Sequence, residues 1–403
     1  MNTSVVHGLD RALPVHSGPR RPDRILICAA FVVSVVGFLQ SASQVAFAQD
    51  NGGAADSVLP PDKLAPDNHC DRNNQVVTFS GTTTWDLCFR LMQPFGLVVQ
   101  RAQFRREPGA PFVLVLFDGR ISEIFVPYHP GLPRFFDISN ANPPLLTLDA
   151  TDCPPPRTLI GNGKVCREIR DRGLAWKDDG LSRRGEELAL WSVLDAGNYN
   201  YILEWAFRDD GSIAVRAGST GPKLHGPDDP VGHMHSMSWR LDIDLNGAGG
   251  DSVFRTEHIE DLSENPSDAD DNETLIATEG GRTWVDTSFS SLDIEDDTLQ
   301  NGRGRPTSYE LVPYRTGTGR QSEDFTKSDF WVTVANPSEL FARDVTSYVN
   351  GQDTSSADVV VWYTGSEHHE NGMRDEDRDA VPVLWTGFEL RPKNLFDGTP
   401  LYP

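Results

Sequence analysis

Two histidines two positions apart, His233 and His235, are the residues of this sequence best placed to hold a metal ion. They lead into residues 238–245, which are predicted to form a β-strand, and side chains two apart in a strand point to the same face. Imidazole suits copper, zinc, iron or nickel. A His-x-His pair can also be a surface or structural feature, so a metal site requires a third ligand. His368 and His369, beyond another predicted strand, are the obvious source.

A tyrosine and an aspartate could carry chemistry beside such a metal. Tyr199 lies in the segment 197–201, whose residue types by themselves indicate a turn followed by a strand tyrosine. Asp137 follows Phe135 and Phe136, and partial desolvation between aromatic rings would raise its pKa toward a value useful for a general base. The alternative for Asp137 is an exposed loop carboxylate, as most aspartates are.

Short strands must position these residues, because β-branched and aromatic segments alternate with Gly, Pro, Asn and Asp turns along the chain. The clearest predicted strands are residues 76–79, 97–104, 112–117, 121–126, 201–207, 212–217, 237–245, 330–334 and 359–363. The segment 185–194 is the best candidate for a short helix. Many short strands in one large unit predict a mainly β fold, a large antiparallel β-sandwich.

The N-terminal segment has the three parts of a secretory signal. Basic residues precede an apolar run of fifteen residues at 25–39, and Ala46-Phe47-Ala48 provides a cleavage site. The run is short for a membrane span, which needs roughly 20 residues, although an uncleaved anchor is the alternative. We expect an exported protein cleaved near Ala48, with a linker at 49–69 and one domain at 70–403.

Cysteine usage agrees with export. Cys28 lies inside the apolar run, which leaves Cys70, Cys88, Cys153 and Cys166 for an oxidising compartment. Proximity along the chain favours pairing Cys70 with Cys88 and Cys153 with Cys166, although four cysteines allow three pairings.

The acidic balance limits the partners. A formal net charge of −23 argues against nucleic acid, whose phosphates require a basic face. Residues 251–300 hold fifteen Asp or Glu against only Arg255 and Arg282. This acidity serves either solubility or the attraction of a cationic substrate, such as a protonated amine.

The order of these features resembles that of the copper amine oxidases: Asn-Tyr first, then His-x-His, then another His near the C terminus. The resemblance covers nearly the whole chain from about residue 76 and implies the catalytic domain of that family, with its β-supersandwich. Segments that match in the same order are residues 117–128, Asp152-Cys153-Pro154 with Cys166, 197–207, 211–221, 233–242, 308–313, 331–333, 358–362 and 391–397. The resemblance also supports the Cys153–Cys166 bridge.

The resemblance implies a Cu(II) site and a quinone cofactor. Tyr199 would be the tyrosine that copper and dioxygen convert to topaquinone (TPQ), next to Asn198 in the cofactor segment. The copper ligands would be His233, His235 and one of the pair His368 and His369, with the second of the pair favoured, as is usual in the family.

Further roles follow from the same resemblance. Asp137 would be the catalytic base, and Tyr128 would hydrogen-bond a quinone oxygen. The activity would be oxidative deamination of a primary amine by dioxygen, releasing an aldehyde, ammonia and hydrogen peroxide. The family works as homodimers, each subunit sending hairpin arms to the other, so a homodimer is implied.

A second, structural metal site is implied as well. Asp242, Asp244 and Asp358, with the carbonyls of Ile243 and Val359, resemble the family's secondary calcium site. Hard oxygen ligands suit Ca²⁺.

Four positions depart from the family pattern. Asn200 replaces an acidic residue, Asp195 replaces a threonine, Phe135 replaces a gate tyrosine and His129 replaces a glycine. The family's smaller N-terminal domains are also missing from the match, so we expect a catalytic domain alone. The departures leave two alternatives open: a non-catalytic copper-binding or scaffold relative with unmodified Tyr199, and a zinc hydrolase built on the same histidines.

Overall fold

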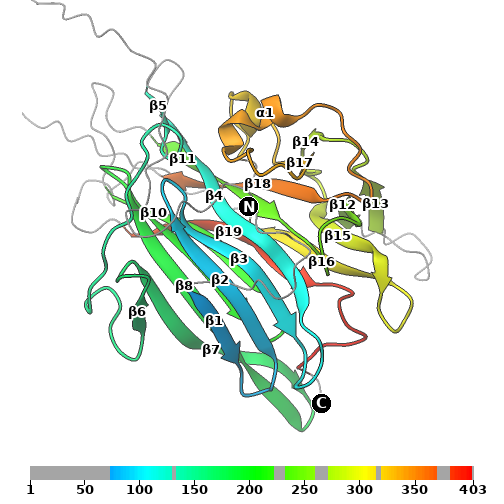
Figure 1. Ribbon diagram of the computed structural model, residues 1–403. Helices are drawn as coiled ribbons and strands as arrows, with labels where there is room; N and C mark the ends of the chain where they lie inside the picture. The colour runs from blue at the N-terminus through cyan, green and yellow to red at the C-terminus, as the bar shows by residue number, and fades with distance from the viewer. Residues whose placement is uncertain are drawn as a thin grey trace, which may run out of the picture. The chain divides into compact units, whose positions relative to one another are not determined.

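Two antiparallel sheets account for most of the part of the chain that the structure describes (Figure 1). This computed structural model describes residues 73–128, 133–221, 232–258, 271–314, 319–369 and 382–401. All of them belong to one unit, Ser57–Pro403. The expected signal segment, the linker at 49–69, Cys70 and His129 lie outside the described residues. The fold is mainly β, as the sequence predicts.

The first sheet holds the predicted metal-binding strands. Among the described residues it has nine strands in the order β1-β2-β3-β4-β11-β18-β17-β14, with β5 paired to β4. Their bounds are β1 Asn74–Thr78, β2 Thr84–Met92, β3 Gly96–Arg105, β4 Val113–Pro127, β5 Arg134–Phe136, β11 His233–Asp242, β14 Gly280–Arg282, β17 Phe330–Val334 and β18 Val359–His369.

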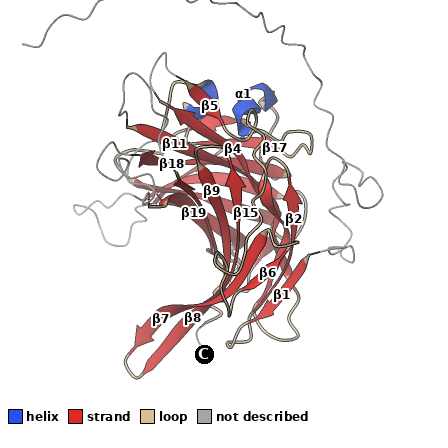
Figure 2. Ribbon diagram, turned by 90° about the vertical axis from the view of Figure 1, so that its left-hand side faces the viewer, coloured by secondary structure: helices blue, strands red, loops and turns tan. Residues whose placement is uncertain are grey.

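The second sheet carries the predicted tyrosine segment. Its ten strands within the described ranges follow the order β13-β12-β15-β16-β19-β10-β9-β8-β7-β6. They are β6 Thr158–Ile160, β7 Val165–Asp178, β8 Leu181–Asp195, β9 Asn200–Arg208, β10 Ile213–Thr220, β12 Asp251–His258, β13 Asp271–Leu275, β15 Phe289–Gln300, β16 Pro306–Tyr314 and β19 Leu384–Pro392. Figure 2 shows β7 and β8 as a long hairpin that runs beyond the strands beside it.

The core lies between the sheets. Alternate side chains of both sheets fill it, among them Trp85 and Trp239 from the first sheet and Trp205 and Tyr309 from the second, all buried. Burial of such aromatic and aliphatic surface stabilises a sandwich by roughly 25 cal/mol per Å² of apolar area. The packed interior therefore fixes both sheets around any site placed between them.

Within the described ranges, three short helices cover part of the outer face of the first sheet. They are η1 Asp324–Thr326, η2 Ala342–Asp344 and α1 Val345–Tyr348. Phe325 and Val345 pack there against Phe125 of β4 and Trp362 of β18, and Figure 1 shows α1 beside β17. None of the helices among the described residues has the length and apolar character needed to span a bilayer.

The predicted helix at 185–194 is wrong. Those residues lie in β8, which pairs with β7 on one side and β9 on the other. Leu188, Leu190 and Leu194 all point into the core at the two-residue period of a strand. Pairing on both edges outweighs the helix propensity of the Glu and Leu residues in this segment, since propensity is a weak preference.

The strands predicted at 112–117 and 121–126 are one strand, β4. Asp118 and Gly119 do not turn the chain, because both pair with β3 on one side and with β11 on the other. A Cβ at Gly119 would lie 2.5 Å from the ring of Trp205. Glycine is therefore required here for the close approach of the second sheet.

The predicted Cys153–Cys166 disulfide is confirmed, with the two Cα atoms 5.8 Å apart. Both residues are buried in a small cluster with Leu148. The predicted Cys70–Cys88 bridge involves Cys70, which the structure does not describe.

Candidate active site

Three histidines converge between the sheets. His233 and His235 lie at the start of β11, and His369 ends the neighbouring strand β18, directly opposite His233 in the strand register. All three are buried, and one ring nitrogen from each lies within 4.8 Å of the others. Nε2 of His233 is 3.1 Å from Nε2 of His235. We refer to these residues as the histidine cluster.

His368 is not part of the histidine cluster. It pairs with Met234, the residue between His233 and His235, and its side chain is exposed on the opposite face of the sheet. Side chains alternate across a strand, so of two consecutive histidines only one can face the interior. The structure places His369 there.

The histidine cluster fits a metal that prefers nitrogen ligands, such as copper or zinc. Burial, together with His233 and His369, lowers the pKa of His235 well below its ordinary value, which keeps its imidazole neutral. A neutral imidazole is the form that binds metals. Three buried ring nitrogens facing one another therefore make a donor set for a transition metal.

Tyr199 lies against the histidine cluster. Its hydroxyl is 3.1 Å from Nε2 of His233 and 3.0 Å from Nδ1 of His369. Its ring meets the ring of His235 edge to face, with centroids 4.6 Å apart. The tyrosine is buried, although it sits in the turn just before β9. The structure thus brings the predicted tyrosine into contact with all three predicted ligands.

The turn that presents Tyr199 is built by polar backbone contacts. Asp195 closes the β8–β9 hairpin opposite Asn200, and its Oδ1 accepts the N–H of Gly197 at 3.0 Å. A Cβ at Gly221 would lie only 2.1 Å from the carbonyl oxygen of Asn198. The close approach of Gly221 therefore fixes the backbone of the half-buried Asn198, next to Tyr199.

Asp137 reaches the same site through a tyrosine that the sequence analysis did not single out. The hydroxyl of Tyr201 donates to Oδ2 of Asp137 at 2.5 Å and lies 3.4 Å from Nδ1 of His235. Burial raises the pKa of Asp137 to about 6, against the hydrogen bond from Tyr201, which lowers it. Tyr201 is two residues from Tyr199, and side chains two apart in a strand point to the same face. This spacing could have identified Tyr201 from the sequence.

Tyr128 completes the wall of the site. Its ring stacks on His233 with centroids 4.2 Å apart, and its hydroxyl is 3.4 Å from that of Tyr199. The ring of Phe135, at the departing gate position, meets Tyr128 edge to face at 5.9 Å. All the site residues predicted for the copper and quinone chemistry, apart from His368, thus lie together.

Comparisons with known proteins agree with this geometry. Residues 229–402 match the family model for the copper amine oxidase enzyme domain. The chain is 26% identical to the peroxisomal copper-containing amine oxidase alpha 2 of Arabidopsis thaliana over 76% of its length, and 28% identical to the histamine oxidase of Arthrobacter globiformis over 78%. These matches support the copper amine oxidase family for this chain. The chain spans 57% and 55% of the length of those two relatives.

Solved structures show the same fold. The copper-containing benzylamine oxidase from Hansenula polymorpha has a TM-score of 0.66 at 19% identity, over 81% of this chain and 61% of that one. The lysyl oxidase of Pichia pastoris has a TM-score of 0.62 at 16% identity, over 90% and 60%. The copper amine oxidase β-sandwich predicted from the sequence is therefore confirmed.

A buried glutamate, Glu123, supports the segment that carries Asp137. Oε1 of Glu123 accepts the backbone N–H groups of Ile124 and Ile138 at 3.0 Å each and that of Ser139 at 3.4 Å. Burial raises its pKa to about 7, against these hydrogen bonds. Sequence reasoning missed Glu123, because only the folded chain brings β4 beneath this loop.

The predicted calcium ligands also come together. Asp242, Asp244 and Asp358 place one carboxylate oxygen each within 4.8 Å of one another; we call them the acidic cluster. Asp251 lies beside it, and burial together with the carboxylates of Asp244, Asp296 and Asp358 raises its pKa to about 9. A buried, carboxylate-rich site of this kind fits a hard divalent cation such as Ca²⁺.

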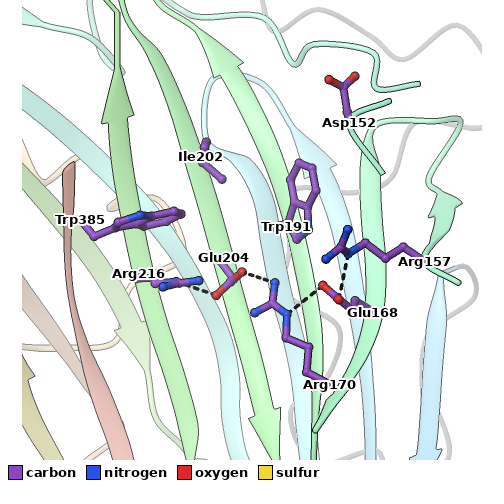
Figure 3. A pocket seen from close by; sticks show the side chains of 9 residues that line it. All are labelled: Asp152, Arg157, Glu168, Arg170, Trp191, Ile202, Glu204, Arg216 and Trp385. Atoms are coloured by element: carbon purple, nitrogen blue, oxygen red, sulfur yellow. Dashed lines mark hydrogen bonds and ion pairs between the residues drawn. The ribbon is translucent and has the colours of Figure 1, made fainter. Parts of the chain in front are cut away.

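A pocket on the other side of β9 is separate from the active site. It has a volume of about 300 Å³ and lies on the face of β9 opposite Tyr201. Arg170 bridges Glu168 at 2.8 Å and Glu204 at 2.7 Å, and Arg216 pairs with Glu204 at 2.6 Å (Figure 3). These ion pairs compensate the charges of the partly buried outer face of the sheet.

Proposed function

We propose that this chain is a primary-amine oxidase that uses copper and a topaquinone made from Tyr199. The observation that carries the proposal is the position of the Tyr199 hydroxyl, about 3 Å from ring nitrogens of both His233 and His369. A metal held by the histidine cluster would contact that tyrosine directly. The names of the relatives, among them primary amine oxidases, support the same activity.

Each residue has a distinct task in this proposal. When bound, copper and the quinone would supply an electrophilic carbonyl and the redox chemistry that consumes dioxygen. Asp137 would remove a proton from the carbon next to the amine nitrogen, a role that its pKa of about 6 suits at neutral pH. Tyr201 would hold the carboxylate of Asp137 in place through its hydrogen bond. The hydroxyl of Tyr128, which faces that of Tyr199, would hold the modified Tyr199 ring.

The net reaction would convert a primary amine, dioxygen and water to an aldehyde, ammonia and hydrogen peroxide. The acidic surface favours cationic amines as substrates, because a net charge of −23 attracts them. We further propose Ca²⁺ in the acidic cluster, export after cleavage near Ala48, and a homodimer. The carboxylates of the acidic cluster support the calcium site. The signal-like N terminus supports export, and the family resemblance supports the homodimer.

Copper reconstitution tests the function. Metal-free protein is titrated with Cu²⁺ under argon, air is admitted, and the visible spectrum is followed. We expect one copper per chain and growth of a quinone band, which Tyr199→Phe abolishes. Replacement of an exposed tyrosine whose hydroxyl donates to Glu389, Tyr314→Phe, should leave the band unchanged. The band-positive protein should then release hydrogen peroxide with primary amines and form a coloured adduct with phenylhydrazine.

The outcome also separates the alternatives. Copper at one per chain without a band would identify a non-catalytic copper-binding relative, as the substitutions at Asp195 and Asn200 allow. The hydrogen bond from Gly197 to Asp195 argues that the turn is intact despite those substitutions. Zinc at full occupancy without quinone absorption would instead favour a hydrolase.

A further inference from the structure

The pocket of about 300 Å³ on the outer face of the second sheet lies apart from the histidine cluster. We call it the outer-face pocket. Trp191 of β8, Glu204 of β9 and Arg216 of β10 lie directly opposite one another in the strand register and form one row across it (Figure 3). Pockets of this size hold small organic molecules. The register therefore sets an indole, a carboxylate and a guanidinium side by side on one face of the sheet.

Two glycines keep the space beside Arg216 open. Gly218 of β10 separates Ile202 from Trp385 in the next row, and a Cβ at Gly218 would lie 2.8 Å from the indole ring of Trp385. Gly387 of β19 lies directly opposite Arg216 and adds no side chain. Ile202 and Trp385 thus wall the pocket, and the missing side chains leave room for a flat ring.

The charged side chains along the pocket form one continuous chain of ion pairs. Arg157, Glu168, Arg170, Glu204 and Arg216 alternate in sign, with successive N···O distances of 2.9, 2.8, 2.7 and 2.6 Å. Three guanidiniums thus share two carboxylates, and an arginine stands at each end. All four carboxylate oxygens face a guanidinium, so the acceptors are already used and the surplus charge of the chain is positive.

Hydrogen-bond donors are what the pocket has left to offer. Arg216 gives Nε to Glu204, and its Nη1 and Nη2 donate no hydrogen bond within the described residues. Trp385 holds that guanidinium, whose Cζ lies 4.2 Å from the ring centroid. The remaining acid, Asp152, is exposed to screening water and already accepts the N–H of Asp149 at 2.9 Å. The free nitrogens of Arg216 therefore form a planar fork that matches a carboxylate.

We propose that the outer-face pocket binds a small organic carboxylate that carries a flat apolar ring. The carboxylate pairs with Nη1 and Nη2 of Arg216, and the ring lies against Trp191 and Ile202. The charged hydrogen bonds orient the ligand, and burial of the ring adds apolar contact. The pocket lies outside the candidate reaction centre, so this site goes beyond the proposed oxidase function and does not rest on it.

Isothermal titration of the full chain tests this, with naphthalene-2-carboxylate as the probe. We expect one site per chain with a Kd below about 1 mM. Naphthalene-2-carboxamide, which keeps the ring and loses the charge, should bind at least about tenfold more weakly. Inorganic phosphate, which has no ring, should also bind more weakly than the probe. Absence of probe binding, or equal affinity for the probe and either of the other two compounds, would overturn the assignment.

Substitutions locate the site. Arg216→Gln removes the fork and should weaken the probe at least about tenfold, while Glu204 keeps its ion pair with Arg170. Trp385→Ala removes the ring that holds Arg216 and should weaken it about threefold or more. Arg184→Gln is the matched control, because Arg184 is an exposed, ion-paired arginine of β8 that does not line the pocket. Wild-type affinity in Arg216→Gln would contradict the proposal.

Two further measurements keep the result specific. Urea unfolding shows whether each variant is folded, and if Arg216→Gln is not, the affinity of Trp385→Ala decides. Metal-free protein, copper-loaded protein and Tyr199→Phe should all bind the probe equally, because the outer-face pocket lies on the far side of β9 from the histidine cluster. Loss of probe binding in Tyr199→Phe would place the carboxylate at the histidine cluster and refute the outer-face site.

Discussion

The hydroxyl of Tyr199 lies 3.0 Å from Nδ1 of His369, a residue 170 positions further along the chain. One residue belongs to the second sheet's β8–β9 turn and the other ends β18 of the first sheet. The contact therefore exists only because the two sheets pack face to face. In this protein the histidine cluster and Tyr199 form a single buried centre across the sandwich interface.

Replacement of His369, but not of His368, should abolish metal binding. His369→Ala removes one of the three nitrogen donors, so we expect copper affinity to fall at least about 100-fold. His368→Ala alters an exposed side chain on the opposite face and serves as the matched control. Copper content after dialysis at fixed free copper measures both. Copper loss in His368→Ala with full retention in His369→Ala would contradict the geometry.

Activity should depend on the ionisation of Asp137. Its pKa of about 6 means that the carboxylate form prevails above pH 6, so kcat/KM should fall about tenfold per pH unit below that value. Asp137→Asn should reduce kcat by roughly 10²–10⁴-fold. A pH profile of kcat/KM for the copper-loaded enzyme measures the first effect. An unchanged rate at pH 5 would exclude Asp137 as the base.

The same carboxylate should lower stability at neutral pH. Its folded pKa of about 6 lies above the ordinary value of 3.8, so the folded chain binds this proton more tightly than the unfolded chain does. The resulting cost is absent below pH 4, grows as pH rises to 6 and then stays constant at about 3 kcal/mol. Asp137→Asn should therefore be more stable than the wild type at pH 7.5 and equal to it at pH 4, as measured by urea unfolding.

Removal of the Tyr201 hydroxyl should shift the acid limb of the pH profile upward. The hydrogen bond from Tyr201 stabilises the ionised form of Asp137 and lowers its pKa. Without it, we expect the limb to move up by on the order of one pH unit. The pH profile of Tyr201→Phe, compared with that of Tyr314→Phe, measures the shift. A downward movement would show that the phenol favours the protonated acid.

Glu123 should act as an acceptor that positions the Asp137 segment. Glu123→Ala leaves buried N–H groups of Ile138 and Ser139 without an acceptor, which should cost about 1–3 kcal/mol and reduce kcat more than it raises KM. Glu123→Gln keeps an acceptor oxygen and should restore most of the activity. Unfolding free energies and steady-state kinetics of both variants decide. Equal losses of activity in Glu123→Ala and Glu123→Gln would mean that the charge of Glu123 is required, rather than its acceptor oxygen.

The sequence alone predicted several of the strands and the identities of most candidate residues. The two-residue period of a strand already implied that His233 and His235 share a face, and the structure has both on β11. Strand composition likewise predicted segments such as 330–334, which is β17. Local periodicity is enough for such statements, because they concern neighbours along one strand.

Local patterns failed where partners outside the segment decide. Residues 185–194 carry helix-forming residues, but strand neighbours on both sides hold them in β8. The strands predicted at 112–117 and 121–126 are one strand, since residues 118 and 119 pair with β3 on one side and with β11 on the other. Neither partner is visible in the segment itself.

The tertiary structure alone decided which residues meet. It placed His369 rather than His368 in the histidine cluster, joined Asp137 to Tyr201, and brought Glu123 and Asp251 to buried sites that no motif marks. The physical reason is that strand register and sheet packing decide which side chains meet, even when the residues are far apart in the sequence. A shift of one residue in register would move every side chain of a strand to the opposite face of the sheet. Sequence thus supplied the chemical groups, and the sandwich determined their contacts.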